Sequence, residues 1–349
     1  MIKRESVTIK EVARQAGVST QTVSRVLNHH PDVAPETRLR VLNVIEKLDY
    51  HPSAVARSLI QRRSWMLGIV TAGLKFIGPS QTLKGIIEQA DRMGYALLLK
   101  ELPGFDTPDI DSVFQALLSR QVDGILWAVP EIGTNRDWIH PKVDALPVPV
   151  IFLNTRPRPG ITSIAIDNAH GACLATQHLF KCGYRRIGHI SGPMDWWEAC
   201  ERFKGWQETL AKAGEAVREF YSVSGDWSSA SGEQAMRKLL FQYPDVQAVF
   251  VANDQMALGA LHVAWEQGLR VPHELGIVGF DGIPEAAYFL PPLTTIDQDP
   301  IAMGKAAVDE LVAAIEAGQQ RIKDEGEIVQ GRSIMLQPRL VARESTGFF

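Results

Sequence analysis

The chain has 349 residues, of which 45% are hydrophobic, and its formal net charge is −4. No run reaches the ~18 apolar residues of a membrane-spanning helix, and residues 2–5, IKRE, are not followed by the apolar core of a secretory signal. The cysteines at 173, 182 and 200 lack the paired spacing of zinc ligands or of a disulfide framework. We therefore expect a cytoplasmic protein with reduced thiols, no metal site and no membrane partner.

The charge is divided unevenly along the chain. Residues 1–64 carry a net charge of +5, whereas the remaining residues carry −9. Because DNA is densely negative, a basic segment joined to an acidic body is typical of a nucleic-acid-binding module attached to another domain. Such charge also occurs on ordinary solvent-exposed protein surfaces. The choice between these two interpretations therefore depends on the motifs within residues 1–64.

Residues 8–28 predict two short helices joined by a tight turn. Thr8 to Glu11 has the pattern of a capping box, and Gly17 ends the first helix. Ser19 caps the second helix, which is expected to reach Asn28. Such a pair is typical of a helix-turn-helix, whose second helix lies in the major groove of DNA. The alternative is a helical hairpin on the surface of another kind of domain.

The second of these helices carries side chains suited to base edges. Thr20, Gln21 and Arg25 face outward when Val23 and Val26 face inward. Glutamine can form two hydrogen bonds with adenine, and arginine can form two with guanine. A third amphipathic helix, 35–48, and a basic segment rich in helix formers, 50–64, follow. We predict an all-α DNA-binding headpiece over 1–51 and a hinge helix with its linker over 52–64.

From residue 65 onward, short apolar runs alternate with amphipathic helices, which is typical of parallel sheets covered on both faces. The runs are too numerous for one sheet, so we predict an α/β core of two doubly wound lobes over 65–340, followed by a tail over 341–349. A ligand would lie between the lobes, at the carboxyl ends of the strands. The expected strands span 66–71, 96–100, 124–128, 148–154, 186–191, 246–253 and 275–280. The expected helices span 80–93, 110–120, 169–182, 198–213, 254–267 and 300–317.

The core lacks the local motifs of common enzyme classes. It contains no GxGxxG or GK[ST] phosphate loop, no GxSxG nucleophile elbow and no HExxH zinc motif. His178 and His189 are expected to be ordinary helix and strand residues. We therefore predict a protein without catalytic residues or a cofactor.

Taken together, the chain resembles the lactose/galactose repressor family of bacterial transcription regulators. The resemblance rests on residues 6–33, SVTIKEVARQAGVSTQTVSRVLNHHPDV, and on VANDQMALGA (251–260), VGFDGIPEA (278–286) and PPLTTIDQD (291–299). It implies a helix-turn-helix headpiece and hinge helix, followed by a two-lobed core like that of periplasmic binding proteins. The implied function is a repressor that binds a palindromic operator in double-stranded DNA as a homodimer and senses a carbohydrate effector.

The resemblance also implies how the hinge contacts DNA. The family inserts a hinge leucine into the minor groove, and the matching residue is Leu59, an apolar wedge that would kink the duplex. So short a helix is expected to order only when two copies pack together on DNA. The residues expected at the DNA are Thr8, Ser19, Thr20, Gln21, Thr22, Ser24, Arg25, Asn28, Ala56 and Leu59.

The ligand cleft is implied in the same way. Arg202 matches the arginine that clamps the sugar, Asn253 and Asp281 match residues at vicinal hydroxyls, and Trp227 matches a stacking ring. Within residues 71–82, an apolar rim is matched by Ala72, Phe76, Gly78, Pro79 and Thr82. The expected ligand-binding residues are Ala72, Phe76, Pro79, Asn154, Glu198, Arg202, Trp227, Asn253, Asp281 and Gln298.

One position departs from the lactose-type members of the family. Glu198 stands where they have a small hydroxyl residue, and Trp196 and Trp197 precede it. Two rings and a carboxylate near the cleft mouth favour a carbohydrate with a second ring or a differently oriented hydroxyl. A purine effector, used by another branch, is the alternative, and the GDW block at 225–227 disfavours it.

Two other classes of function are alternatives to a regulator. A periplasmic sugar-binding protein is disfavoured by the headpiece and by the lack of a signal peptide. A sugar-processing enzyme is disfavoured by the lack of catalytic motifs. The chain has no apolar heptads after Ala317 of the kind that make tetramers in this family, so a dimer is expected.

Overall fold

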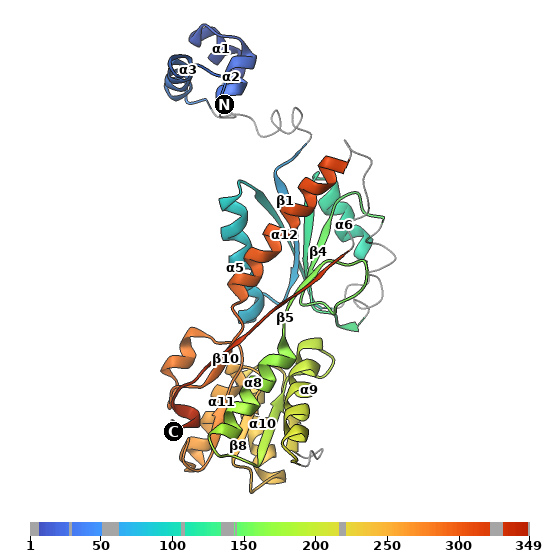
Figure 1. Cartoon of the computed structure of the whole chain (residues 1–349), viewed down its shortest axis with the longest axis vertical. Coiled ribbons are helices and arrows are strands. Elements are labelled where there is room, and N and C mark those ends of the chain that lie inside the picture. The colour runs from blue at the N-terminus through green and yellow to red at the C-terminus, as the bar shows by residue number, and fades with distance from the viewer. Residues whose placement is uncertain are drawn as a thin grey trace, which may run out of the picture. The chain divides into compact units, whose positions relative to one another are not determined.

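The structure is a computed structural model that describes residues 7–27, 30–50, 63–105, 109–133, 143, 145–215, 221–321 and 331–347. The chain forms two compact units, Met1–Ser64 and Trp65–Phe349 (Figure 1). The division coincides with the predicted end of the linker. The expected DNA contacts of Asn28, Ala56 and Leu59 lie outside the described residues, as does the hinge over 51–62.

The first unit contains the three predicted helices, α1 (Ile9–Ala16), α2 (Thr20–Leu27) and α3 (Pro35–Lys47). Thr8 caps α1, since its hydroxyl accepts a hydrogen bond from the Glu11 backbone N–H, and Gly17 ends it at a φ of 65°. The Glu11 carboxylate is bonded to Arg14 and Gln15, so only one half of the expected capping box is found. The helices enclose a small core made of Val12, Ala13, Ala16, Val23, Val26 and Val41.

Lobe 1 of the second unit is a six-stranded parallel sheet in the order β11-β5-β4-β3-β1-β2. Its strands are β1 (Met66–Ala72), β2 (Ala96–Leu102), β3 (Gly124–Ala128), β4 (Val150–Leu153), β5 (Ser163–Ile166) and β11 (Ser333–Leu336). Its principal helices are α5 (Ile77–Arg92), α6 (Ile110–Leu118) and α12 (Pro300–Arg321). One hydrophobic cluster includes residues of α5 and α12, and a second includes residues of α6, so both faces of the sheet are covered.

Lobe 2 is a four-stranded parallel sheet in the order β7-β6-β8-β9. Its strands are β6 (Ile187–Ser191), β7 (Ser222–Ser224), β8 (Ala248–Val251) and β9 (Gly276–Val278). Its helices are α8 (Asn168–Lys181), α9 (Trp197–Lys212), α10 (Ser229–Gln242), α11 (Asp254–Glu266) and the 3-10 helix η3 (Pro284–Tyr288). β6, β8 and β9 are buried along their whole length, as the near-continuous apolar runs predict, whereas only the middle residue of the edge strand β7 is buried.

The chain passes between the lobes at several points. β5 leads into α8, and the pair β10 (Thr295–Asp297) and β12 (Arg339–Val341) is antiparallel. α12 then returns to lobe 1, as Figure 1 shows. The lobes are therefore both built from segments that are distant in the sequence, and the cleft between them is crossed by connecting chain.

The predicted two-lobed fold is confirmed, but its boundaries need correction. The expected tail over 341–349 is part of lobe 2 up to Gly347, because Ser345 and Thr346, in the 3-10 helix η4 (Glu344–Thr346), are fully buried. The Ser345 hydroxyl donates to the Ile277 carbonyl at 2.6 Å. The sequence analysis did not identify β5, β7, α10, β10, β11 and β12.

Glycines allow α5 and α12 to pack at very short distance. A Cβ atom on Gly85 of α5 would lie 2.2 Å from the Ile301 carbonyl oxygen, and one on Gly304 of α12 would lie 2.2 Å from that of Thr82. Backbone atoms cannot rotate away as a side chain can, so the two helices would have to separate.

We expect Gly304→Ala to lower the free energy of unfolding of the core by about 1–3 kcal/mol, because overpacking forces the helices apart. Gly318→Ala is the matched control in the same helix, since no atom lies within 4 Å of its added Cβ. Alanine's better helix propensity should make that control neutral or stabilising by up to ~1 kcal/mol. Urea unfolding measures both, and equal stabilities for the two variants would contradict the helix-contact argument.

Candidate functional site

A cleft lies between the lobes of the core and encloses about 1010 Å³ of space, including solvent at its mouth. Its lobe 1 wall is largely apolar, with contributions from Ile69, Thr71, Phe76, Ile77, Gly78, Pro79, Thr82, Leu83, Ile86, Ala128, Pro130, Leu153 and Asn154. Its lobe 2 wall is polar and aromatic, and comprises Trp196, Glu198, Arg202, Trp227, Asn253, Gln255 and Asp281. The lining is completed by Gln298, in the crossover segment between β10 and α12, and by Pro300 and Met303 of α12. Such a cleft suits a ligand with one apolar face and several hydroxyl groups.

The structure brings together the predicted ligand residues with one exception. Phe76, Pro79, Asn154, Glu198, Arg202, Trp227, Asn253, Asp281 and Gln298 all line the cleft. Ala72 is not among the lining residues, because its side chain is fully buried in the lobe 1 core. Trp197 is also withdrawn from the cleft mouth, since it is buried and does not line the cleft.

Several lining residues were missed by sequence reasoning. Ile69 and Thr71 lie on the same face of β1, and Leu83 and Ile86 share a face of α5 with Pro79. The two-residue period of the strand and the three- or four-residue spacing of the helix are the signals that would have found them.

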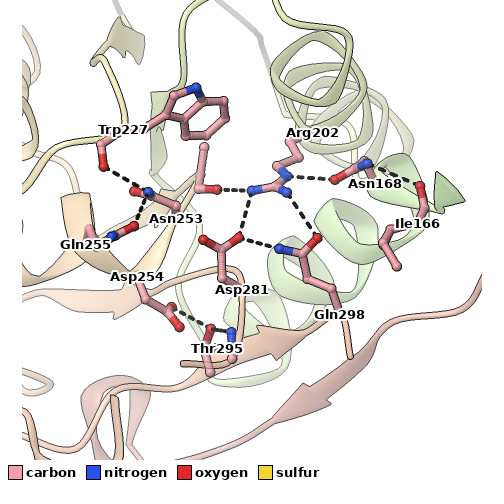
Figure 2. A network of polar contacts seen from close by, with 12 residues as sticks. Ile166, Asn168, Arg202, Trp227, Asn253, Asp254, Gln255, Asp281, Thr295 and Gln298 are labelled. Carbon is pink, nitrogen blue, oxygen red and sulfur yellow. Dashed lines mark hydrogen bonds and ion pairs between the residues drawn. The ribbon is translucent and has the colours of Figure 1, made fainter. Parts of the chain in front are cut away.

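The Arg202 guanidinium is the centre of the lobe 2 wall (Figure 2). Its Nη1 donates to the Asp281 carboxylate at 3.2 Å and to the Ala252 carbonyl at 2.5 Å. Its Nε donates to Asn168 Oδ1 at 2.8 Å, and its Nη2 donates to Gln298 Oε1 at 3.4 Å. Gln298 Nε2 also donates to Asp281 at 2.5 Å, which closes the network.

The face of the guanidinium is covered as well as its edge. Arg202 Cζ lies 3.8 Å from the centre of the Phe280 ring, which is fully buried, and 5.6 Å from the Trp227 ring. Hydrogen bonds and stacking together hold the arginine in one orientation. Sequence reasoning found the arginine and the carboxylate but missed Phe280, which reads as an ordinary residue after a strand.

The polar residues of lobe 2 reach the cleft because parallel strands end at one edge of their sheet. Asn253 follows β8, Asp281 follows β9, and Trp227 follows β7. Trp227 and Asp281 have positive φ angles of 75° and 115°, and Asn154 of lobe 1 has 51°. Residues other than glycine rarely adopt such angles, and they concentrate where a side chain is held for a ligand.

The Trp227 ring packs against Gly192, where an added Cβ would come 2.1 Å from a ring atom. Its neighbour Trp196 meets it edge-on, with ring centres 5.8 Å apart and planes at 73°. Two rings of lobe 1 lie beside Trp196: the centre of its ring is 4.9 Å from the centre of the Phe105 ring and 6.2 Å from that of the Phe76 ring. Aromatic rings from both lobes therefore form one connected row beside the cleft.

The Asn253 side chain is engaged mainly in hydrogen bonds within the protein, whereas its predicted role is to contact ligand hydroxyls. Its Oδ1 accepts from the Met256 N–H at 2.9 Å and so caps α11. Its Nδ2 donates to the Trp227 carbonyl and to Gln255 Oε1, both at 3.0 Å (Figure 2). With both amide hydrogens donated, Asn253 positions Trp227, and only a lone pair of Oδ1 is left for a ligand hydroxyl.

A second carboxylate, that of Asp254, supports the turn that carries Asp281. Asp254 is fully buried and accepts hydrogen bonds from the Thr295 hydroxyl at 2.6 Å and the Ile283 backbone N–H at 2.9 Å. Burial raises the pKa of Asp254 to about 8, helped by the negative charge of Asp281. Burial also raises the pKa of Asp281 to about 6, against the opposing effect of Arg202.

Glu198 lies in the first turn of α9 and lines the cleft half-buried. Burial raises its pKa to about 6, and the charge of Glu131 adds to that effect, whereas the Arg202 charge opposes it. Across the cleft in lobe 1, Arg158 Nη1 is 3.0 Å from the Glu131 carboxylate and Arg156 Nε is 4.0 Å from it. Glu198 itself makes no side-chain ion pair with any residue that the structure describes.

In the first unit, the exposure of side chains on α2 agrees in part with the prediction. Thr20, Gln21 and Arg25 are exposed on α2, whereas Ser24 is half-buried. The Ser19 hydroxyl accepts from the Thr22 backbone N–H at 3.1 Å and contacts the Thr22 hydroxyl at 2.9 Å, so both side chains are engaged in capping.

Arg25 has a partner within the headpiece. Its Nη1 lies 3.4 Å from the Asp32 carboxylate, and both side chains are about half exposed. This ion pair would have to open before Arg25 could use Nη1 to bond a guanine. Exposed pairs contribute little to stability, so opening it costs at most ~1 kcal/mol.

Two further features bear on the class of protein. Within the part of the chain that the structure describes, no helix has the length and apolar character needed to cross a membrane. The same residues include no group of three His, Cys, Asp or Glu side chains arranged to hold a metal ion.

The raised pKa of Asp254 predicts how the free energy of unfolding of the core changes with pH. Its folded pKa exceeds its unfolded value of ~3.9, so the folded core binds more protons than the unfolded chain between about pH 4 and pH 8. The contribution of Asp254 to the free energy of unfolding therefore falls as the pH rises through this window. Asn can keep both hydrogen bonds without ionising, since it can accept from Ile283 and donate to Thr295.

We expect Asp254→Asn to gain stability relative to the wild type by about 1–3 kcal/mol between pH 5 and pH 8. Urea unfolding at several pH values measures the difference. Parallel pH profiles for the two proteins would show that Asp254 does not titrate in the window.

Comparison with known proteins agrees with this architecture. Residues 8–53 match the bacterial regulatory proteins of the lacI family, and residues 176–346 match a periplasmic binding protein-like domain. The chain is 33% identical to the HTH-type transcriptional repressor PurR of Haemophilus influenzae (strain PittEE), over 97% of this chain and 98% of the relative. It is 32% identical to the lactose operon repressor of Escherichia coli (strain K12), over 97% and 91% of the two chains.

A solved structure shows the same fold. The lac repressor dimer bound to operator and the anti-inducer ONPF has a TM-score of 0.82 and 32% identity, with 99% of this chain and 100% of that chain covered. The relatives are transcriptional repressors and are similar to this chain over nearly its whole length. The chain therefore belongs to the lacI family of bacterial regulatory proteins, as a ligand-responsive transcription regulator with a helix-turn-helix headpiece and not as an enzyme.

Proposed function

We propose that this protein is a carbohydrate-responsive repressor that acts in the cytoplasm. It binds a palindromic operator as a homodimer, and an effector in the interlobe cleft changes its affinity for DNA. The observation that carries the carbohydrate assignment is the fixed group of Arg202, Asp281 and Gln298 beside the Trp227 ring. Planar polar groups suit adjacent hydroxyls, and an aromatic ring suits the apolar face of a sugar.

The exposed side chains of α2 support the DNA-binding role. Gln21 and Arg25 offer hydrogen bonds to base edges, and the basic headpiece attracts the phosphates. In this proposal Thr8, Ser24 and Asn28 add contacts around the recognition helix, and Ala56 and Leu59 enter the minor groove from the hinge.

Exposed apolar side chains of lobe 2 support dimer formation. Leu258 and Trp265 lie on one side of α11, and Tyr288 and Leu290 lie in and just after η3, where both are more than four-fifths exposed. Residues of α11 and η3 pack in the same hydrophobic cluster, so both elements are firmly anchored in lobe 2. A second copy of the chain would cover such side chains, which soluble monomers seldom expose in groups.

Selection from random DNA should yield a roughly palindromic site whose half-site centres are about 10 base pairs apart. Affinity for that site should fall about 1000-fold or more between 50 and 200 mM salt, because binding releases counterions from the phosphates. Gln21→Ala should relax the preference at one base pair and leave the salt dependence unchanged. If no sequence were enriched at ~0.15 M salt, with or without sugars, the operator-binding proposal would fail.

Arg202→Ala should abolish the response to sugar while the protein still binds its operator. Truncation leaves the buried Asp281 carboxylate without its cationic neighbour, which should cost ~2–4 kcal/mol of binding free energy. Arg270→Ala is the control, because Arg270 is exposed and forms an ion pair with Glu274 on the surface. A thermal-shift screen of mono- and disaccharides identifies the ligand, and calorimetry then compares the variants. Wild-type affinity in Arg202→Ala would remove the cleft from the proposal.

A further inference from the structure

Few charged side chains line the cleft, and the acidic ones outnumber the basic ones. Among the residues that line it, Glu198 and Asp281 are acidic, and Arg202 is the single basic one. The cleft therefore has an excess of negative charge whenever both carboxyl groups are ionised. A ligand placed there must not add a further negative charge without a counter-charge.

Arg202 cannot supply that counter-charge. Four of its five N–H donors are directed to Asp281, Asn168, the Ala252 carbonyl and Gln298, and its charge is balanced by Asp281 at 3.2 Å. It is thus suited to neutral hydroxyls that join an existing network. A phosphate or carboxylate would have to compete with Asp281 for the same guanidinium.

The arginines of lobe 1 are committed in a similar way. Arg158 and Arg156 flank the buried Glu131 carboxylate at 3.0 and 4.0 Å, and neither lines the cleft. Both would have to leave a buried carboxylate in order to bind an anionic ligand, which is a costly exchange.

The cleft also offers polar groups that make no hydrogen bond or ion pair with another described side chain. The Glu198 carboxylate lines the cleft at the start of α9 and accepts a hydrogen bond from its own backbone N–H, so its remaining lone pairs can accept from a ligand. On the opposite wall, the buried Thr71 hydroxyl has no hydrogen-bond partner. A carboxylate acceptor matched with a neutral hydroxyl is complementary to an uncharged polyol that donates its own hydroxyl hydrogens.

We infer that the effector is an uncharged carbohydrate, and that Glu198 determines this specificity by accepting a hydrogen bond from a ligand hydroxyl and repelling sugars that carry a phosphate or a carboxylate. The inference rests on the proposed carbohydrate function and adds the charge class of the ligand. It assigns rejection of anionic sugars to one side chain at the start of α9.

The test compares neutral sugars with acidic counterparts of the same ring. The probes are glucose, galactose, cellobiose and lactose, the 6-phosphates of the two monosaccharides, the 6′-phosphates of the two disaccharides, and glucuronate and galacturonate. Calorimetry measures each with the full-length wild type, Glu198→Gln and Glu208→Gln. Glu208 is the matched control, because it lies on the same helix and is exposed between Lys204 and Lys212.

A neutral sugar should bind the wild type at least about 100-fold more tightly than its acidic counterparts. Glu198→Gln keeps an acceptor but removes the charge, so its preference should shrink about tenfold or more. Glu208→Gln should keep the wild-type preference. An acidic sugar that binds as tightly as its neutral parent, or an unchanged preference in Glu198→Gln, would overturn the inference and leave carbohydrate sensing intact. Binding of none of these sugars would instead overturn the carbohydrate function, and the inference with it.

Discussion

The ligand-binding core depends on burying one guanidinium, that of Arg202, in the wall of the cleft. An unpaired buried charge costs several kcal/mol, and the fold supplies partners for four of the five N–H donors of the side chain. The partners come from α8, from the end of β8, from the turn after β9 and from the crossover before α12. A displacement of the crossover that carries Gln298 therefore changes the hydrogen bonds of the guanidinium, and the arginine links ligand contact to the relative position of the lobes.

The same site contains a backbone conformation and a pair of buried carboxyl groups that are each unfavourable by themselves. Asp281 has a φ of 115°, and the negative charge of its carboxylate adds to the effect of burial in raising the pKa of Asp254. Hydrogen bonds from Thr295 and Ile283 hold the turn in place, so the cost is met by surrounding structure. A side chain that is fixed before the ligand arrives loses little entropy on binding, which is the advantage gained.

The two walls of the cleft differ in their chemistry. Lobe 1 offers Ile69, Leu83 and other apolar side chains, whereas lobe 2 offers fixed polar groups. A ligand with an apolar face and several hydroxyls satisfies both walls at once. Contacts that differ between two conformations are what an effector needs to shift a conformational equilibrium, and allosteric coupling between two sites typically amounts to ~1–3 kcal/mol.

The sequence by itself determined the local features, because capping residues, glycine turns and hydrophobic periods act over a few neighbours. It predicted α1, α2, α3 and most helices and strands of the core, and the family resemblance supplied Arg202, Trp227 and Asp281. The tertiary structure alone decided which short segments pair, since β11 joins β5 from far along the chain and strands of three or four residues have little pattern of their own. It also decided side-chain roles: Ala72 is buried in the core, Asn253 is bound to the Trp227 carbonyl, and Arg25 is paired with Asp32. Those outcomes depend on groups that are adjacent in space and not in sequence, and hydrogen bonding and burial are settled only when the lobes and the headpiece have folded.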